Sequence, residues 1–357
     1  MSAGSFIRNV PLSPAATGAL LYALTKAPLK LREPLVQRFL QYFSATTLAR
    51  VVTVLKWLFA LGIARNIHIW LSNIAQNNFR IRSEKHRYNW PNEVAVVTGA
   101  ASGFGALITK GLVEKGINVM AVDIRSEVPE DMKLHPRIQW YQCDITDREK
   151  VMELAEKIRK QYGDPSILVN NAGIAYTHGI LSASEKALRR TYDVNILSHY
   201  FTLQAFLPAM IANKKGHVVA MASMSSFVTP PGIVPYANTK AAVMSLHEGL
   251  MQEVRVVHKA PEIKFSIIHP TFANTPLAAP FMKELQEKKV LQVLDPIDVS
   301  NAVVNQIMSC TGRQVLIGDI NLLRGLRAWP HWLTQAIIHL TDGTVDVAIV
   351  GKETTSS

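Results

Sequence analysis

The stretch Val94-Ala-Val-Val-Thr-Gly-Ala-Ala-Ser-Gly-Phe-Gly105 decides the fold, because a short apolar run leads directly into a glycine-rich loop. The β-branched run Val94–Val97 predicts a buried strand, and a helical pattern follows over Gly103–Lys115. Glycines permit a tight turn and a close backbone approach to a pyrophosphate, whose charge is attracted by the free amides at the helix start. This stretch therefore predicts a strand–loop–helix unit that binds a dinucleotide.

Short apolar runs continue to alternate with longer helical patterns over residues 93–319, which predicts an α/β fold with a doubly wound parallel sheet. The seven expected strands are Val94–Val97, Asn118–Val122, Ile138–Gln142, Ile167–Val169, His217–Ala222, Lys264–Ile268 and Arg313–Ile317. The five expected helices are Gly103–Lys115, Arg148–Gln161, Ser184–Ile211, Pro235–Val257 and Pro296–Met308. We expect one catalytic domain over residues 93–319.

Polar side chains follow three of these strands where a doubly wound sheet binds its ligands. Asp123 ends the second strand, eighteen residues past Gly105, where a carboxylate can accept hydrogen bonds from ribose hydroxyls. Asp144 follows the third strand and Asn171 follows the fourth. Each residue alone would be an ordinary turn former, but their occurrence in this order favours a nucleotide site.

The segment Tyr236-Ala-Asn-Thr-Lys240, with Ser223 thirteen residues upstream, predicts a proton-transfer site. Residues four apart share one helix face, so the phenol and the ammonium can point into one site. A phenol has a pKa near 10, and a neighbouring cation favours the phenolate. Asn195 lies inside the expected helix Ser184–Ile211, where asparagine costs about 0.7 kcal/mol relative to alanine, so a compensating role is plausible. An exposed helix face is the simpler interpretation of Tyr236 and Lys240 taken alone.

In combination these motifs resemble the short-chain dehydrogenase/reductase family over about Glu93 to Asp319, and the Gly-x-x-x-Gly-x-Gly spacing matches the loop of that family. The resemblance implies a Rossmann fold and an NAD(P)-dependent oxidoreductase acting on CH–OH groups, with no metal. It also implies that Ser223 binds the substrate oxygen, while Tyr236 exchanges a proton with that oxygen. Lys240 would hold the ribose and lower the tyrosine pKa, and Asn195 would help to hold a proton-relay water.

The resemblance extends to the residues that would bind the cofactor. These are Thr98, Gly99, Ser102, Gly103, Phe104, Gly105, Asp123, Asp144, Asn171, Tyr236, Lys240, Pro270 and Thr275. In the segment after the sixth strand, Thr271 replaces the glycine that is usual in the family. Asp123 would repel a 2′-phosphate, so we expect NAD rather than NADP, although Arg125 could pair with a phosphate and keeps NADP possible.

The N-terminal region carries most of the excess positive charge of the chain. The formal net charge is +11, and residues 1–90 hold twelve Lys or Arg against Glu33 and Glu84. Because the basic residues are interleaved with apolar ones, we expect a membrane surface rather than nucleic acid as partner. Cys143 and Cys310 are too few for a disulfide framework, which favours a reducing compartment. No secretory signal is expected, and a mitochondrial transit peptide stays an alternative because residues 1–32 are basic.

Residues 1–76 are expected to associate with a membrane without a clean span, on the cytosolic face of the endoplasmic reticulum or a lipid droplet. Prolines shorten the first apolar stretch, while Lys56 and Arg65 interrupt the second, Val51–Leu71. A helical hairpin packed on the enzyme or on a partner subunit is the alternative. Residues 77–92 are interpreted as a linker and residues 320–357 as an amphipathic tail.

The N-terminal region and the tail resemble membrane-associated family members that act on retinoids and steroids. Apolar residues after strands five and six favour a lipophilic alcohol or ketone as substrate. They are Met224, Phe227, Val228, Pro230, Pro231, Ile233, Val234, Phe272, Leu277, Phe281 and Met282. Two alternatives stay open: an NADP-dependent biosynthetic ketoreductase and a non-catalytic membrane scaffold that binds lipid. The resemblance also implies a possible homodimer formed through helices beside the active site.

Overall fold

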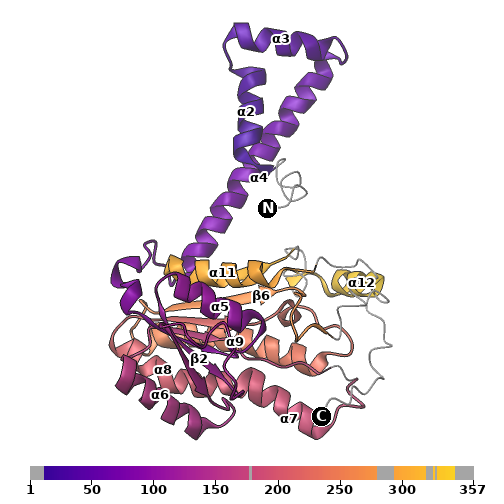
Figure 1. The fold of residues 1–357 in the computed structure, drawn as a ribbon. Helices are drawn as coiled ribbons and strands as arrows, with labels where there is room; N and C mark the ends of the chain where they lie inside the picture. The colour runs from indigo at the N-terminus through magenta and orange to yellow at the C-terminus, as the bar shows by residue number, and fades with distance from the viewer. Residues whose placement is uncertain (1–11, 177–178, 280–292, 319–324, 326–327, 342–357) are drawn as a thin grey trace. The chain divides into compact units, whose positions relative to one another are not determined.

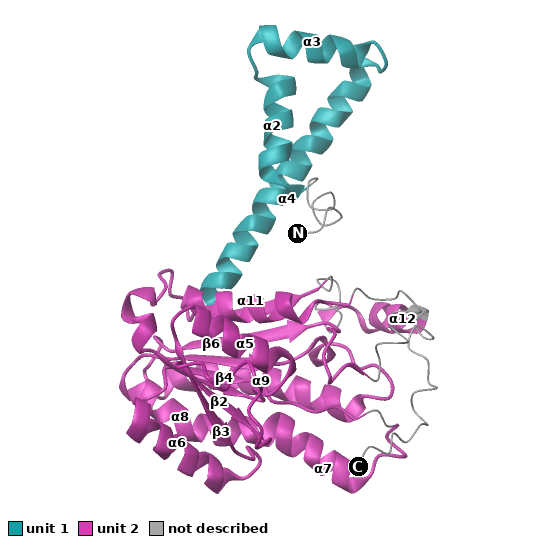
Figure 2. Cartoon of the chain, in the orientation of Figure 1, with its two compact units in different colours: residues 1–75 teal, residues 76–357 magenta. Residues whose placement is uncertain are grey.

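The computed structural model describes residues 12–176, 179–279, 293–318, 325 and 328–341. The chain divides into two compact units, residues 1–75 and residues 76–357 (Figure 2). The second unit contains every strand of the described chain, in one parallel sheet (Figure 1). The α/β fold class expected from the sequence is thereby confirmed.

The sheet has seven parallel strands in the order β3-β2-β1-β4-β5-β6-β7. Their bounds are β1 Val94–Thr98, β2 Asn118–Asp123, β3 Ile138–Gln142, β4 Ile167–Asn170, β5 His217–Met221, β6 Lys264–Pro270 and β7 Arg313–Ile317. From β1 the chain first builds outward through β2 to β3, and then returns to place β4 on the other side of β1. This reversal between β1 and β4 is the point at which a doubly wound sheet binds its ligands, at the carboxyl ends of the strands.

Helices cover both faces of the sheet because successive strand residues point to opposite sides. Ala95 and Val97 of β1 pack with α5 and α11, whereas Val94 and Val96 pack with α6, α8 and α9 (Figure 1). Residues on both faces of β1 are fully or almost fully buried, as expected for a parallel strand. These helices are α5 Gly103–Glu114, α6 Arg148–Tyr162, α8 Ser198–Ala212, α9 Val234–Val256 and α11 Pro296–Ser309.

The prediction of a single helix over Ser184–Ile211 is wrong in one respect. The structure divides it into α7 (Glu185–Tyr192), a π-helical turn over Asp193–Leu197, and α8. Asn195 lies in this turn and is fully buried. A π turn widens the helix by one residue and occurs frequently at functional sites.

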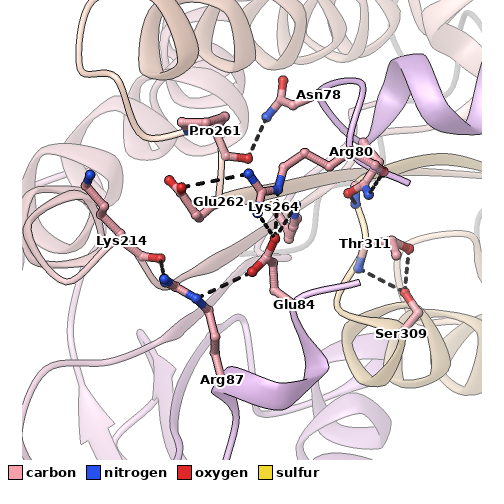
Figure 3. A network of polar contacts seen from close by, with 12 residues as sticks. Asn78, Arg80, Glu84, Arg87, Lys214, Pro261, Glu262, Lys264, Ser309 and Thr311 are labelled. Carbon is pink, nitrogen blue, oxygen red and sulfur yellow. Dashed lines mark hydrogen bonds and ion pairs between the residues drawn. The ribbon is translucent and has the colours of Figure 1, made fainter. Parts of the chain in front are cut away.

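The segment expected to be a linker is a packed part of the second unit. Residues 77–92 contain two short 3₁₀ turns, Lys85–Arg87 and Trp90–Asn92, and the Glu84 side chain is almost fully buried. Glu84 forms ion pairs with Arg80 at 2.7 Å and Arg87 at 3.4 Å, and it lies 3.8 Å from the buried Lys264 ammonium at the start of β6 (Figure 3). These charges hold the segment at the amino end of β6.

The side chains of Gln76 and Asn77 bind the outer edge of the sheet at β7. Gln76 accepts a hydrogen bond from the Gln314 amide through its side-chain oxygen at 3.0 Å. The side-chain oxygen of Asn77 accepts from the Gly312 amide, also at 3.0 Å. One amide of β7 and the amide of the residue just before the strand are therefore satisfied by side chains.

The first unit consists of α2 (Pro14–Thr25), α3 (Leu29–Leu40) and most of α4 (Ala45–Gln76). A Cβ at Gly62 of α4 would lie 2.7 Å from the Leu12 carbonyl oxygen, so α4 and the chain entering α2 approach closely. Lys56 and Arg65 do not interrupt α4, which runs for 32 residues and is long and apolar enough to cross a membrane by length and composition. Of its most apolar window, 6% is buried within the chain. The helix α12 (His331–Thr341) lies in the expected tail, most of which is outside the described residues.

We predict that removing the charge of Glu84 and removing the charge of Lys264 have opposite effects on the stability of the fold. Glu84→Gln should lower the free energy of unfolding by about 3 kcal/mol, because it removes the carboxylate that forms an ion pair with the buried Lys264. Lys264→Met should instead stabilise the fold by about 1 kcal/mol at pH 7, since Glu84 keeps both arginines. A lower unfolding temperature for Lys264→Met than for the wild type would contradict this.

Lys264 also makes the stability of the fold depend on pH. Burial lowers the pKa of Lys264 from 10.5 to about 8. Between these two values the unfolded chain binds more protons than the folded chain, so this lysine makes stability rise with pH across that window. Unfolding temperatures of both proteins should be measured from pH 7 to 10.5. The higher stability of Lys264→Met over the wild type should shrink across this range, because the wild-type lysine loses its proton.

Candidate active site

The glycine-rich loop lies between β1 and α5, as the sequence predicts. Gly99 and Gly103 have positive φ angles of +67° and +56°, which side chains rarely adopt. A Cβ at Gly105 would lie 2.0 Å from the Gly99 carbonyl oxygen, so the first turn of α5 can approach the loop only without a side chain there. Ser102 precedes the helix as its N-cap residue.

Thr98 and Asn171 connect the ends of β1 and β4. The Thr98 hydroxyl accepts hydrogen bonds from the amides of Asn171 and Ala172 at 3.0 and 3.1 Å. In the other direction, the Asn171 side chain donates to the carbonyl oxygen of Thr98 at 2.9 Å. The sequence predicts that both residues bind the cofactor, and in the structure they bind each other and thereby fix the loop.

A cavity of about 340 Å³ opens over this loop. Its lining includes Gly99, Ser102, Gly103, Phe104, Asp123, Asp144, Asn171 and Thr275 from the expected cofactor set. Asp123 accepts hydrogen bonds from the amides of Ala101 at 2.9 Å and Arg125 at 3.1 Å. The carboxylate is thus fixed at the end of β2, with Arg125 also in the cavity wall.

Asp144 has a partner that the sequence did not reveal. Its carboxylate accepts hydrogen bonds from the Thr146 amide and hydroxyl, and Arg190 of α7 donates to it at 3.4 Å. Burial favours a higher pKa for Asp144, but these hydrogen bonds and the Arg190 charge outweigh it and lower the pKa. Arg190 also lines the cavity. No motif spacing marks it, because it reaches the site from a separate helix.

A second cavity of about 150 Å³ contains Ser223, Tyr236, Lys240 and Pro270 in its wall. Burial raises the pKa of Tyr236 above its ordinary value, and a hydrogen bond with Ser223 only partly offsets this rise. The Ser223 hydroxyl oxygen accepts from the Ser225 amide at 3.1 Å, which fixes the serine side chain. The serine and the phenol therefore face the same space.

Lys240 is buried one helical turn beyond Tyr236 on α9. Its ammonium donates to the Met221 carbonyl oxygen at 2.8 Å and lies 5.5 Å from the centroid of the Tyr236 ring. Burial lowers the pKa of Lys240 to about 8, so the amine is still mostly protonated at pH 7. A cation this close favours the phenolate form of the tyrosine.

Asn195 is held against the segment that follows β4. It accepts a hydrogen bond from the Ile174 amide and donates to the Ile174 carbonyl oxygen, both at 2.8 Å. It also donates to the Thr239 hydroxyl at 3.1 Å. A Cβ at Gly173 would lie 3.5 Å from both the Asn195 side-chain oxygen and the Lys240 ammonium, so these two groups face the same glycine.

The expected apolar wall is present in part. Met224, Ile233, Phe272 and Leu277 line the second cavity, together with Thr271. In contrast, Phe227 and Val228 belong to a small hydrophobic cluster with Met224. Phe281 and Met282 lie outside the described residues.

The residues present fit a nicotinamide dinucleotide. The two cavities share Phe104, Asn171, Gly173, Thr275 and Leu277 in their linings and are therefore adjacent. The first has the glycine loop that a pyrophosphate needs and a carboxylate for a ribose. The second is lined by Ser223, Tyr236 and Lys240, for which the sequence predicts proton transfer. An elongated ligand can thus reach from Asp123 to Tyr236.

Comparison with known proteins supports this interpretation. The family model described as short chain dehydrogenase matches residues 93–286. The chain is 36% identical over 211 residues to dehydrogenase RED2 of Cochliobolus heterostrophus, covering 58% of this chain and 77% of that protein. It is 30% identical over 230 residues to estradiol 17-beta-dehydrogenase 11 of Homo sapiens, covering 63% of this chain and 75% of that protein.

A solved structure of a short-chain dehydrogenase is also similar to this chain. The crystal structure of a short-chain dehydrogenase from Streptomyces avermitilis superposes with a TM-score of 0.59 at 26% identity. The superposition covers 71% of this chain and 99% of that one. The likeness therefore extends over the whole of the other enzyme.

Proposed function

Because this chain belongs to the short-chain dehydrogenase family of NAD(P)-dependent oxidoreductases, we propose that it transfers a hydride between NAD and a lipophilic alcohol or ketone. The observation that carries the proposal is the meeting of Ser223, Tyr236 and Lys240 at an apolar cavity beside the nucleotide cavity. A scaffold without turnover would have no need to keep a buried ammonium next to a buried phenol.

The proposed mechanism assigns one role to each of the three groups. The nicotinamide, when bound, supplies or accepts the hydride. Ser223 donates a hydrogen bond to the substrate oxygen, and Tyr236 gives a proton to that oxygen in reduction or removes it in oxidation. Lys240 stabilises the phenolate from one helical turn away. Beside these three groups, Asn195 holds the Ile174 main chain next to Gly173, which Lys240 also approaches.

The proposed substrate class follows from the second cavity. Its wall is largely apolar, with Phe104, Met224, Ile233, Phe272 and Leu277 around the catalytic groups. Such a lining favours a steroid, a retinoid or another lipid over a sugar or an acid. The similarity to an estradiol dehydrogenase agrees with this class.

We also propose that the N-terminal unit attaches the enzyme to the cytosolic face of the endoplasmic reticulum or a lipid droplet. α4 is apolar and mostly exposed, with Trp57 68% and Trp70 55% exposed. Basic residues next to apolar segments favour the cytoplasmic side and anionic lipid. A lipophilic substrate dissolved in such a membrane would then be close to the catalytic unit.

Tyr236→Phe should reduce turnover by at least about a hundredfold and leave NAD affinity nearly unchanged, because it removes only the exchangeable proton. Turnover is measured from nicotinamide absorbance with estradiol, retinol and a long-chain alcohol, and affinity by titration. Tyr200→Phe, at an exposed tyrosine of α8, is the matched control. Near-normal turnover in Tyr236→Phe would disprove the mechanism.

NAD should bind more tightly than NADP, and Asp123→Asn should narrow the ratio of the two dissociation constants by about tenfold. Asparagine can still accept a hydrogen bond from the loop amides but no longer repels a 2′-phosphate. Titrating both cofactors into both proteins measures the ratio. Tighter NADP binding by the wild type would mean that Arg125 governs the choice, and would favour the biosynthetic ketoreductase.

A chain that begins at Gln76 should be soluble and active on a detergent-dispersed substrate, whereas the full-length chain should sediment with membranes. This boundary removes the apolar helices but keeps the side chains that bind the edge of β7. Cell fractionation followed by activity assays makes the comparison. Recovery of the full-length chain in the soluble fraction without detergent would contradict membrane attachment.

A further inference from the structure

His269 connects the catalytic serine to the edge strand of the sheet. It is the penultimate residue of β6, and its ring is fully buried. Its Nδ1 lies 3.0 Å from the Ser223 carbonyl oxygen, and its Nε2 lies 3.2 Å from the side-chain nitrogen of Gln314 on β7. The ring also packs against Phe227, with 4.7 Å between centroids.

These two contacts determine which ring nitrogen carries the proton. A carbonyl oxygen can only accept, so Nδ1 must donate to Ser223. An amide nitrogen can only donate, so Nε2 must accept from Gln314. A doubly protonated ring would set two donors against each other at Nε2. The arrangement therefore selects the neutral imidazole with its proton on Nδ1.

We infer that His269 is a positioning residue that holds the Ser223 main chain in place for proton transfer. This inference rests on the proposed role of Ser223. The serine follows β5 in an extended conformation, with φ −164° and ψ 164°. Its carbonyl oxygen also accepts from the Ser226 amide at 3.0 Å. The His269 ring, on β6, thus holds the main chain of Ser223 just after the neighbouring strand β5. The hydroxyl of this serine faces Tyr236.

The geometry distinguishes two substitutions at this position. In His269→Asn the side-chain amide nitrogen replaces Nδ1 and can still donate to the Ser223 carbonyl. In His269→Leu a similar volume remains but no donor is left. A misplacement of a reacting group by about 1 Å can reduce a rate by about a hundredfold. The leucine variant should therefore lose kcat and the asparagine variant should recover most of it.

The test measures turnover of the full-length chain in detergent, with NAD and with estradiol or retinol as the alcohol. His269→Leu should lower kcat by about tenfold to a hundredfold, with NAD affinity unchanged. His269→Asn should stay within about threefold of the wild type. In a Ser223→Ala background, His269→Leu should cause no further loss, because a residue that acts through Ser223 has nothing left to position.

A matched control and a spectroscopic measurement separate positioning from general destabilisation. His217→Leu removes another buried histidine, which contacts Ser266 at the opposite end of the sheet, and should lower thermal stability without changing kcat. The ¹⁵N shifts of the His269 ring, assigned by comparison with His269→Asn, should show a protonated Nδ1 and an unprotonated Nε2.

The outcomes distinguish this inference from the proposed function. If Ser223→Ala keeps full activity, the proposed function fails. If Ser223→Ala is impaired but His269→Leu is not, or if the two losses multiply, the inference about His269 is overturned while the proposed function stands. A ring protonated on Nε2 would also overturn it.

Discussion

The burial of the Lys240 ammonium is the constraint on which the arrangement of the site depends. A charged group loses its solvation in an apolar interior unless polar groups replace the water. The Met221 carbonyl oxygen, at the end of β5, provides one such group. This pairing holds the first two turns of α9 at the end of β5, which brings Tyr236 beside Ser223. The lowered pKa of Lys240, near 8, reflects the cost of burying the charge.

Much of the fold could be predicted from the sequence because its signals are local. Strands buried on both faces, such as β1, β4, β5 and β6, give short runs rich in apolar residues, and the partly exposed edge strands β3 and β7 still carry β-branched or aromatic residues. All seven strands were therefore predicted to within a few residues. The site motifs are also local: Gly105 must lack a side chain, and Tyr236 and Lys240 are one helical turn apart. Their residue types therefore carry the information without knowledge of the tertiary structure.

The features that could not be predicted depend on distant partners. The π turn at Asn195 accompanies hydrogen bonds to Ile174, and helix propensity contains no information about that contact. Residues 77–92 have the polar composition of a linker, but Glu84 pairs with Lys264, far along the chain. Lys56 and Arg65 lie inside α4 and do not break it, since lysine and arginine favour helices nearly as well as leucine.

The closure of the β7 edge has a consequence for the solubility of shortened chains. An unpaired edge strand is a template on which a second chain can add a strand and start aggregation. Here the Gln76 side chain accepts from the Gln314 amide of β7, and the Asn77 side chain accepts from the Gly312 amide just before the strand. Proteolysis just after Asn77 would remove both at once. We therefore expect the loss of Gln76 and Asn77 to favour self-association of the catalytic unit.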